Sequence, residues 1–155
     1  MIEIKKKYFQ IIIKELEKDY LIDSFFDTLS NLTEIGKDVY NKEFSQKILE
    51  KINNAGNIRI FVAIKDSEIV GSITAIIEQK FIHNGGKICH IEDVVTRKGF
   101  EKLGIGSLLV EKVLELAKKE KCYKVILNCS EYNSKFYENL GFYKHDTGMR
   151  YNIKI

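Results

Sequence analysis

Proline is absent from this sequence, and long hydrophobic runs are absent as well. No apolar stretch reaches the roughly 18–20 residues that span a bilayer, and residues 1–7 lack the apolar core of a signal peptide. We therefore expect a cytoplasmic protein without a membrane partner. The lack of proline is a compositional bias that says nothing about function.

An excess of charge of one sign is also missing. The 25 basic and 22 acidic residues are interspersed and give a net charge of +3, which is too mild for a protein that binds nucleic acid. A modest positive balance still suits a phosphorylated or CoA-type ligand. With 155 residues, 45% of them hydrophobic, the chain is long enough for one compact core, and we predict a single domain over residues 1–155.

Cysteine is scarce, and its arrangement argues against disulfides and metal sites. Cys89, Cys122 and Cys129 are odd in number, and no two of them have the spacing of metal ligands. All three lie in apolar surroundings, so we expect small buried thiols in a reducing compartment and no bound metal. A nucleophilic cysteine is not expected either, because His90, which follows Cys89, should point to the opposite face of a strand.

The hydrophobic pattern alternates between the periods of helices and strands and predicts an α/β fold. Helices are predicted over residues 23–32, 41–52, 105–119 and 133–140, and strands over residues 8–13, 58–64, 69–82, 87–96, 124–129, 142–144 and 149–153. Short turns join the strands between residues 58 and 96, which indicates an antiparallel meander. The helix over residues 105–119 is a crossover, and a crossover makes its two strands parallel. We therefore predict a mixed central sheet, antiparallel in its N-terminal part and parallel in its C-terminal part, flanked by helices.

A glycine turn stands where the clearest helix begins, within Lys102-Leu103-Gly104-Ile105-Gly106-Ser107. Glycines let the backbone approach an anion closely. The unpaired N–H groups of a helix start and the helix dipole favour a pyrophosphate at such a place. Taken alone, the turn is equally compatible with a plain flexible loop, because it has neither the third glycine of a dinucleotide fingerprint nor the Lys-Ser/Thr of a Walker loop.

Two signatures resemble those of the GNAT acetyltransferase superfamily. Residues 101–106 are similar to its CoA motif, Arg/Gln-x-x-Gly-x-Gly/Ala, and residues 133–142 are similar to its second signature, Asn-x-x-(x)-Phe-Tyr-x-x-x-Gly-Phe. The fold that this resemblance implies is the GNAT fold. A narrower resemblance, to the glucosamine-6-phosphate N-acetyltransferases, rests on residues 32–36, 78–83, 90–95 and 122–127.

The narrower resemblance implies transfer of the acetyl group of acetyl-CoA to the 2-amino group of glucosamine 6-phosphate. Transfer would be direct, within a ternary complex. The product, N-acetylglucosamine 6-phosphate, would serve the synthesis of UDP-N-acetylglucosamine. Small enzymes of this type are homodimers with the acceptor site near the subunit boundary, so a homodimer is expected here as well.

The resemblance also assigns roles around acetyl-CoA. The backbone N–H of Val94 would donate to the acetyl carbonyl as an oxyanion-hole donor, and Tyr137 would be the general acid for the CoA thiolate. The implied cofactor-binding residues are Val94, Val95, Thr96, Lys102, Leu103, Gly104, Ile105, Gly106, Ser107, Asn128, Asn133 and Tyr137. From the residues alone, Val94 would belong to a core strand, Tyr137 would be a packed aromatic, and Asn133 would be a helix cap.

For the acceptor, the resemblance implies contacts from Thr33, Lys80, Phe81, Ile82, His83, Glu92, Asp93, Val94, Tyr123, Lys124 and Arg150. Glu92 and Asn128 complete the catalytic candidates, and the identity of the base stays open. Alternation places Glu92 and Asp93 on opposite faces of a strand, so only a strand irregularity would let both carboxylates meet one ligand. The alternative for this acidic pair is a solvated strand edge.

Three positions depart from the family pattern. Glu101 stands where the CoA motif has Arg or Gln, and its side chain is expected to point to solvent, so that nearby basic residues supply the positive charge: Arg97, Lys98, Lys102. Asn128 replaces an acidic residue whose backbone carbonyl is thought to hold the amine. Asn152 replaces an arginine that grips the sugar phosphate, and Arg150 is the expected substitute. These departures leave two alternatives open: a GNAT enzyme for another amine (protein N-terminus, polyamine or antibiotic), or a non-catalytic acyl-CoA-binding module.

Overall fold

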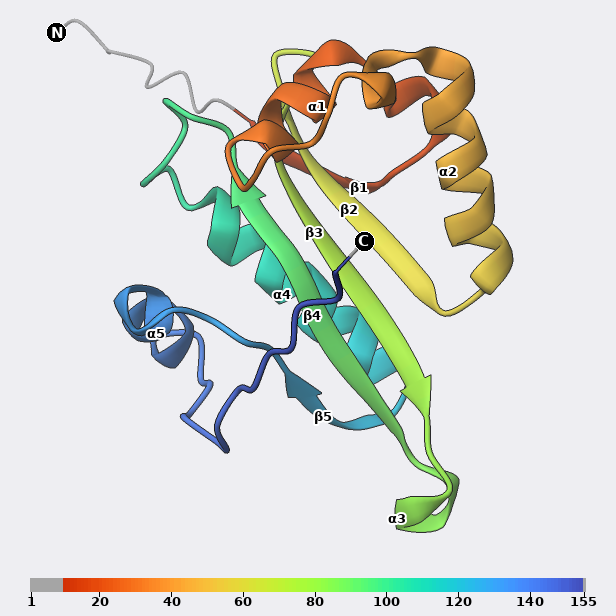
Figure 1. Ribbon diagram of the computed structural model, residues 1–155. Helices are drawn as coiled ribbons and strands as arrows, with labels where there is room; N and C mark the ends of the chain where they lie inside the picture. Colours follow the sequence, from red (N-terminus) through yellow and green to blue (C-terminus); the bar gives the residue numbers. More distant parts are fainter. Residues whose placement is uncertain (1–9, 155) are drawn as a thin grey trace, which may run out of the picture.

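The computed structural model describes residues 10–154 and contains a five-stranded sheet in the order β1-β2-β3-β4-β5 (Figure 1). The strands are Ile12–Glu15 (β1), Ile58–Lys65 (β2), Glu68–Gln79 (β3), Lys87–Thr96 (β4) and Cys122–Ile126 (β5). The pairs from β1 to β4 are antiparallel, and β4 and β5 are parallel. The last pair is parallel because a helix, α4, carries the chain back along the sheet before β5 begins. The predicted mixed sheet is confirmed.

Helices cover both faces of the sheet (Figure 1). On one face, α1 (Asp23–Ser30) and α2 (Lys42–Ala55) cover a core that contains Phe25, Phe26, Leu49, Val62 and Ile69. On the other face, α4 (Ile105–Lys119) turns its apolar stripe to the sheet, and the buried members of that stripe are Ile105, Leu109, Val110, Val113 and Ala117.

The other helical segments are short. They are η1 (Lys18–Tyr20), η2 (Asp38–Tyr40), α3 (Ile82–Gly85) at the tip of the β3–β4 hairpin, and α5 (Glu131–Glu138) beyond β5. Within residues 10–154, no helix has the length and apolar character needed to cross a membrane.

Several boundaries differ from the sequence-based prediction. The first strand was expected over residues 8–13; residues 8 and 9 lie outside the described part, and β1 begins at Ile12. The strand expected over residues 69–82 ends at Gln79, because His83 and Asn84 adopt left-handed φ values of 51° and 56° within α3. The helix expected over residues 133–140 starts at Glu131, because the Ser130 side chain accepts from the N–H of Asn133 and caps the helix.

The two strands expected at the C-terminus, residues 142–144 and 149–153, are wrong for the described chain. Neither segment pairs with the sheet, and β5 remains its edge strand. A strand needs a partner for its N–H and C=O groups, and a periodic sequence alone cannot supply one. The side chains of Tyr143, Met149, Tyr151 and Ile153 are consequently left 76–91% exposed.

Close packing of α4 against β3 depends on Gly71. A Cβ atom at this position would lie 2.6 Å from Ile105 Cγ2 and 3.0 Å from Leu109 Cδ1, both on fully buried side chains. We expect Gly71→Ala to lower the free energy of unfolding by about 1–3 kcal/mol, because overpacking forces the neighbours to move. Urea denaturation measures the loss. Gly71→Ala should lower the free energy of unfolding less when Ile105→Ala is already present, because the clashing side chain is then absent. If the losses from the two substitutions simply add, the packing explanation is wrong.

Candidate active site

Strands β4 and β5 separate halfway along β4. Their pairing ends at His90 and Ile126, whereas β4 continues to Thr96. From Ile91 to Thr96, no described strand pairs with the side of β4 that faces β5. This side can therefore bind an extended ligand by backbone hydrogen bonds, in the manner of an added strand.

A β-bulge interrupts β4 at this opening. Glu92 pairs with Thr74 and Val95 pairs with Ser72, so two residues of β4 stand opposite one residue of β3. Asp93 has a left-handed φ of 51°. As a result the side chains of Glu92 and Asp93 are both exposed, and Val94 is half-buried. The β-bulge is therefore the strand irregularity that would let both carboxylates meet one ligand.

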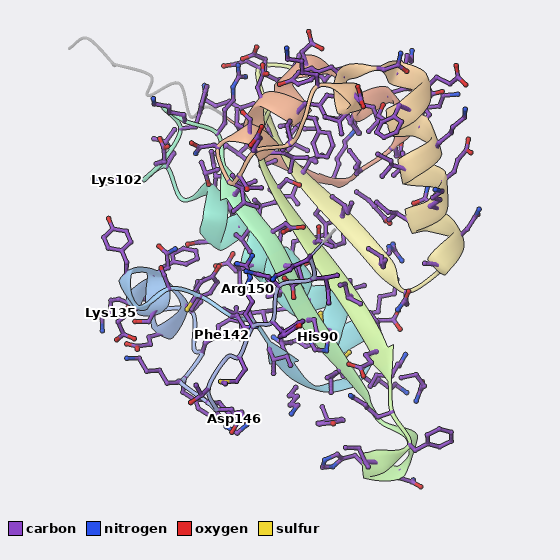
Figure 2. All side chains as sticks on the ribbon, viewed as in Figure 1. His90, Lys102, Lys135, Phe142, Asp146 and Arg150 are labelled. Carbon is purple, nitrogen blue, oxygen red and sulfur yellow. The ribbon has the colours of Figure 1, made fainter. Side chains whose placement is uncertain are left out.

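The loop between β4 and α4 forms a concave group of backbone donors. Lys102 and Gly104 have positive φ values of 62° and 81°, and Lys102 extends from the outer side of the loop (Figure 2). Gly104 is the N-cap of α4 and has no side chain to accept a hydrogen bond, whereas Asn41 and Ser130 cap α2 and α5. The first N–H groups of α4 therefore remain available, and they fit the pyrophosphate of CoA.

Gly106 brings the two sequence signatures together in space. It lies in the first turn of α4, and a Cβ atom there would lie 3.1 Å from Cζ of Phe136 on α5. The glycine therefore permits close approach of the two helices as well as of an anion.

Asn133 lies inside α5, and Ser130 is the N-cap of that helix. The alternative interpretation of Asn133 as a helix cap is therefore wrong.

Tyr137 is both packed and directed to a cleft. Its ring makes edge contacts with Phe136 and Phe142, at centroid distances of 4.9 and 5.8 Å. Burial, and to a lesser extent the nearby Cys129, raise the pKa of Tyr137 above its usual value of 10. The phenol is therefore protonated at neutral pH and can donate a hydrogen bond.

The cleft has a volume of about 660 Å³ and lies between β5, α5 and residues 140–148. Its walls bring together four of the expected site residues: Tyr123, Lys124, Asn128 and Tyr137. Asn128 lies against the C-terminal segment, since a Cβ atom on Gly148 would be 3.2 Å from Asn128 Oδ1.

Most of the expected acceptor residues fall into two groups. At the hairpin tip, His83 stacks on Tyr123 with ring centroids 4.1 Å apart, and Phe81 is fully exposed beside the half-exposed Ile82. The second group is Glu92 to Val94, at the bulge. The strand from Lys87 to Glu92, the nearest member of the second group, separates the groups by about 16 Å, at 3.3 Å per residue. One chain therefore does not bring the hairpin tip and the bulge onto a single small sugar.

Lys80, at the base of the hairpin tip, is held by a residue that the sequence did not single out. The Glu78 carboxylate accepts from Lys80 Nζ and contacts His90 Nε2 at 2.7 Å. The Lys80 and His90 contacts lower the pKa of Glu78, the Lys80 hydrogen bond most strongly. Glu78 meets His90 because β3 and β4 are neighbouring strands, and no local sequence pattern shows this cross-strand position.

Arg150 lies on the C-terminal segment (Figure 2). It donates from Nε to the Asn152 side chain at 2.7 Å. Arg150, the expected substitute for the family's arginine, therefore contacts the asparagine that stands in that arginine's position. Thr33, by contrast, lies close to the end of β4, because the Asn31 amide two residues earlier donates to the carbonyl of Thr96.

The structure adds detail to the expectations for Glu101 and the nearby cations. Glu101 is exposed, as expected, and its carboxylate accepts from the N–H of Gly99 at 2.7 Å. Arg97 pairs with Glu68 at 3.2 Å and lies over the ring of Phe100, so its charge is already engaged. Lys98 and Lys102 are exposed and, together with the backbone donors, remain the expected anion-binding groups of the loop.

The cysteines are also less uniform than expected. Cys89 is buried, and burial raises the pKa of its thiol to about 12, so it is unreactive. Cys122 is half-buried and Cys129 is exposed, which contradicts the expectation of three buried thiols. Within the described residues there is no group of three or more His, Cys, Asp or Glu side chains that could hold a metal ion.

Comparison with known proteins agrees with this geometry. The model of the acetyltransferase (GNAT) family matches residues 17–142. The glucosamine 6-phosphate N-acetyltransferase of Arabidopsis thaliana is 38% identical over 133 residues, which are 83% of this chain and 87% of that protein. The enzyme of the same name from Trypanosoma brucei brucei is 38% identical over 95 residues, 61% of this chain and 65% of that protein.

A solved structure gives the same relationship. The crystal structure of glucosamine-6-phosphate N-acetyltransferase from Arabidopsis thaliana superposes with a TM-score of 0.88 at 32% identity, covering 94% of this chain and 99% of that one. The family model covers most of the chain, and the superposition extends over nearly all of it. The chain therefore belongs to the GNAT family of acetyltransferases.

Proposed function

We propose that this enzyme transfers the acetyl group of acetyl-CoA to the 2-amino group of glucosamine 6-phosphate. The observation that carries the proposal is the bulge in β4. It exposes Glu92 and Asp93 together at the opening between β4 and β5, beside the backbone donors at the start of α4. The names of the relatives that align over most of the chain support the same acceptor.

Direct transfer in a ternary complex assigns a task to each group. The amine nitrogen forms a bond to the acetyl carbon, the carbon–sulfur bond breaks, the nitrogen loses a proton, and the sulfur leaves as a thiolate that takes up a proton from water. The N–H of Val94 donates to the carbonyl oxygen as negative charge develops there. Tyr137 donates to the leaving sulfur. Because burial raises the pKa of Tyr137, hydrogen bonding to the developing thiolate is favoured over complete proton transfer.

The amine must be neutral before it can attack. Asn128 has no ionisable side chain, so its contribution is a backbone carbonyl that accepts from the amine. Glu92 is the carboxylate that can take the proton, directly or through water, since it is exposed at the opening. The product, N-acetylglucosamine 6-phosphate, is a precursor for UDP-N-acetylglucosamine.

The decisive experiment is thiol release from acetyl-CoA. We expect release when glucosamine 6-phosphate is added, and little release with glucosamine, because Lys80, His83 and Lys124 lack their anionic partner in the unphosphorylated sugar. Mass spectrometry should show one acetyl group on the sugar nitrogen. Absence of release at any concentration of the sugar phosphate would overturn the proposed acceptor.

A cytoplasmic homodimer with shared acceptor sites belongs to the same proposal. The hairpin tip and the bulge are too far apart in one chain to grip a single hexose phosphate, and a second copy can bring them together. The exposed side chains of Tyr143, Met149, Tyr151 and Ile153, with the unpaired edge of β5, offer apolar surface and backbone groups for such an interface.

A different amine acceptor is the second candidate. The observation in its favour is that the family's phosphate-binding arginine is replaced by Asn152, which is engaged by Arg150. A panel of peptide, polyamine and aminoglycoside amines tests it. Faster acetylation of any of these than of glucosamine 6-phosphate would favour this candidate over the first. Tight CoA binding without turnover on any amine would favour a non-catalytic module.

A further inference from the structure

Asn31 lies where three parts of the proposed site meet. It ends α1, two residues before Thr33, and its Nδ2 donates to the carbonyl of Thr96 at 2.7 Å. Thr96 is the last residue of β4 and lies 65 positions further along the chain. The end of the strand that would pair with the pantetheine arm is thus fixed by a side chain from the acceptor side of the site.

The same side chain reaches the loop that precedes α4. The Glu101 carboxylate accepts from the N–H of Gly99 at 2.7 Å. Its own backbone N–H, that of Gly99 and, more weakly, the Asn31 side chain lower the pKa of Glu101. Lys98 adds a nearby positive charge. Asn31 and Glu101 therefore form a bridge that links α1, the end of β4 and residues 97–104, and we refer to this set of contacts as the Asn31–Glu101 bridge.

We propose that Asn31 and Glu101 are positioning residues for acetyl-CoA, which hold residues 97–104 in the shape that turns the first N–H groups of α4 toward the pyrophosphate. The inference rests on the acetyl-CoA site proposed above. Gly99, Lys102 and Gly104 all have positive φ values, a backbone shape that costs conformational entropy to fix. The bridge fixes it before the ligand arrives, so less of the binding energy is spent on ordering the loop.

Two opposing effects of Glu101 can be separated by substitution. Its carboxylate accepts from the loop backbone, which favours binding, whereas its negative charge repels a pyrophosphate, which opposes binding. Glutamine keeps an acceptor oxygen and removes the charge. Alanine removes both.

Equilibrium binding of acetyl-CoA, measured by calorimetry, and steady-state kinetics test the bridge together. We expect Glu101→Ala and Asn31→Ala to raise Kd and KM for acetyl-CoA about fivefold while kcat changes less than about twofold. Glu101→Gln should bind acetyl-CoA at least as tightly as the wild type. In the variant with both alanines, the increase in Kd should be smaller than the product of the two single increases, because both substitutions break the same bridge.

Matched controls exist elsewhere in the chain. Asn57 makes the same kind of contact, from Nδ2 to the Ile77 carbonyl at 3.2 Å, near the other end of β3, so Asn57→Ala should leave Kd for acetyl-CoA unchanged. Glu50 is exposed on α2, and Glu50→Ala should also leave Kd unchanged. An equal loss in these controls would show a general effect on folding and would overturn the proposal.

The proposal is also wrong if Glu101→Ala and Asn31→Ala bind acetyl-CoA like the wild type, or if Glu101→Gln loses as much affinity as Glu101→Ala. Because Kd is measured without acceptor, the result does not depend on which amine is acetylated. A wild-type protein that binds acetyl-CoA but leaves glucosamine 6-phosphate unmodified would overturn the proposed acceptor alone. A wild-type protein that does not bind acetyl-CoA would overturn both proposals.

Discussion

Replacement of Tyr137 by phenylalanine is expected to lower kcat about 100-fold, because it removes the donor to the departing thiolate. The phenylalanine ring can keep the edge contacts with Phe136 and Phe142, so the fold and the affinity for acetyl-CoA should change little. Thiol-release kinetics give kcat, and calorimetry gives Kd. The result would separate the catalytic role of the hydroxyl from the packing role of the ring.

The matched control for this substitution is Tyr132→Phe. Tyr132 lies on the same helix, α5, but is 94% exposed, so the loss of its hydroxyl should leave kcat unchanged. The pH profile gives a second check. A raised pKa keeps Tyr137 protonated through neutral pH, so kcat should not fall from loss of this proton below about pH 10. If Tyr137→Phe and the wild type turn over equally, the hydroxyl has no catalytic role.

A second large effect is expected when two inactive variants are combined. Tyr137→Phe impairs the chemical step, and Lys80→Ala with His83→Ala impairs the hairpin tip, so each homodimer should have about 1% of wild-type activity or less. If each site takes its hairpin tip from the partner, every heterodimer contains one intact site. Random association at equal amounts should then restore about a quarter of wild-type activity, since half of the dimers are mixed and each has one working site.

Co-expression of the two differently tagged variants, followed by tandem purification, isolates the mixed dimer, which should have about half of wild-type activity because one of its two sites is intact. Two differently tagged copies of the same hairpin variant are the control and should stay inactive. If the mixed dimer is inactive while the wild-type protein is a dimer, each chain completes its own site. A wild-type protein that is monomeric and active would refute the shared site as well.

Local patterns carry much of the fold in this chain. The limits of β4 and α4 agree with the sequence-based prediction, because alternation in one and a 3.6-residue apolar stripe in the other are strong, and because a glycine directly precedes each element. The limits of α1, α2, β3, β5 and α5 differ from the prediction by up to three residues. A left-handed turn at His83 and Asn84 follows the end of β3, and the capping Ser130 sets the start of α5; neither has a strong signal in the pattern.

The C-terminal strands show the limit of pattern-based prediction. Residues 149–153 have the composition of a strand, but pairing is a property of two segments, and the described chain gives this segment no partner. The Asn31–Glu101 bridge likewise depends on contact between segments that are distant in the sequence. Its contacts join residues up to 65 positions apart, and no local spacing predicts them.

The sequence by itself determined the order of the five strands and main helices from β1 to α5, the mixed sheet and the resemblance to acetyltransferases, because these depend on short-range periodicity and on contiguous motifs. The tertiary structure alone decided that the two motifs meet through Gly106 and Phe136, that a bulge exposes Glu92 and Asp93 together, and that the hairpin tip lies far from that bulge in one chain. The physical reason is that backbone register and side-chain contact between distant segments depend on how the whole core packs.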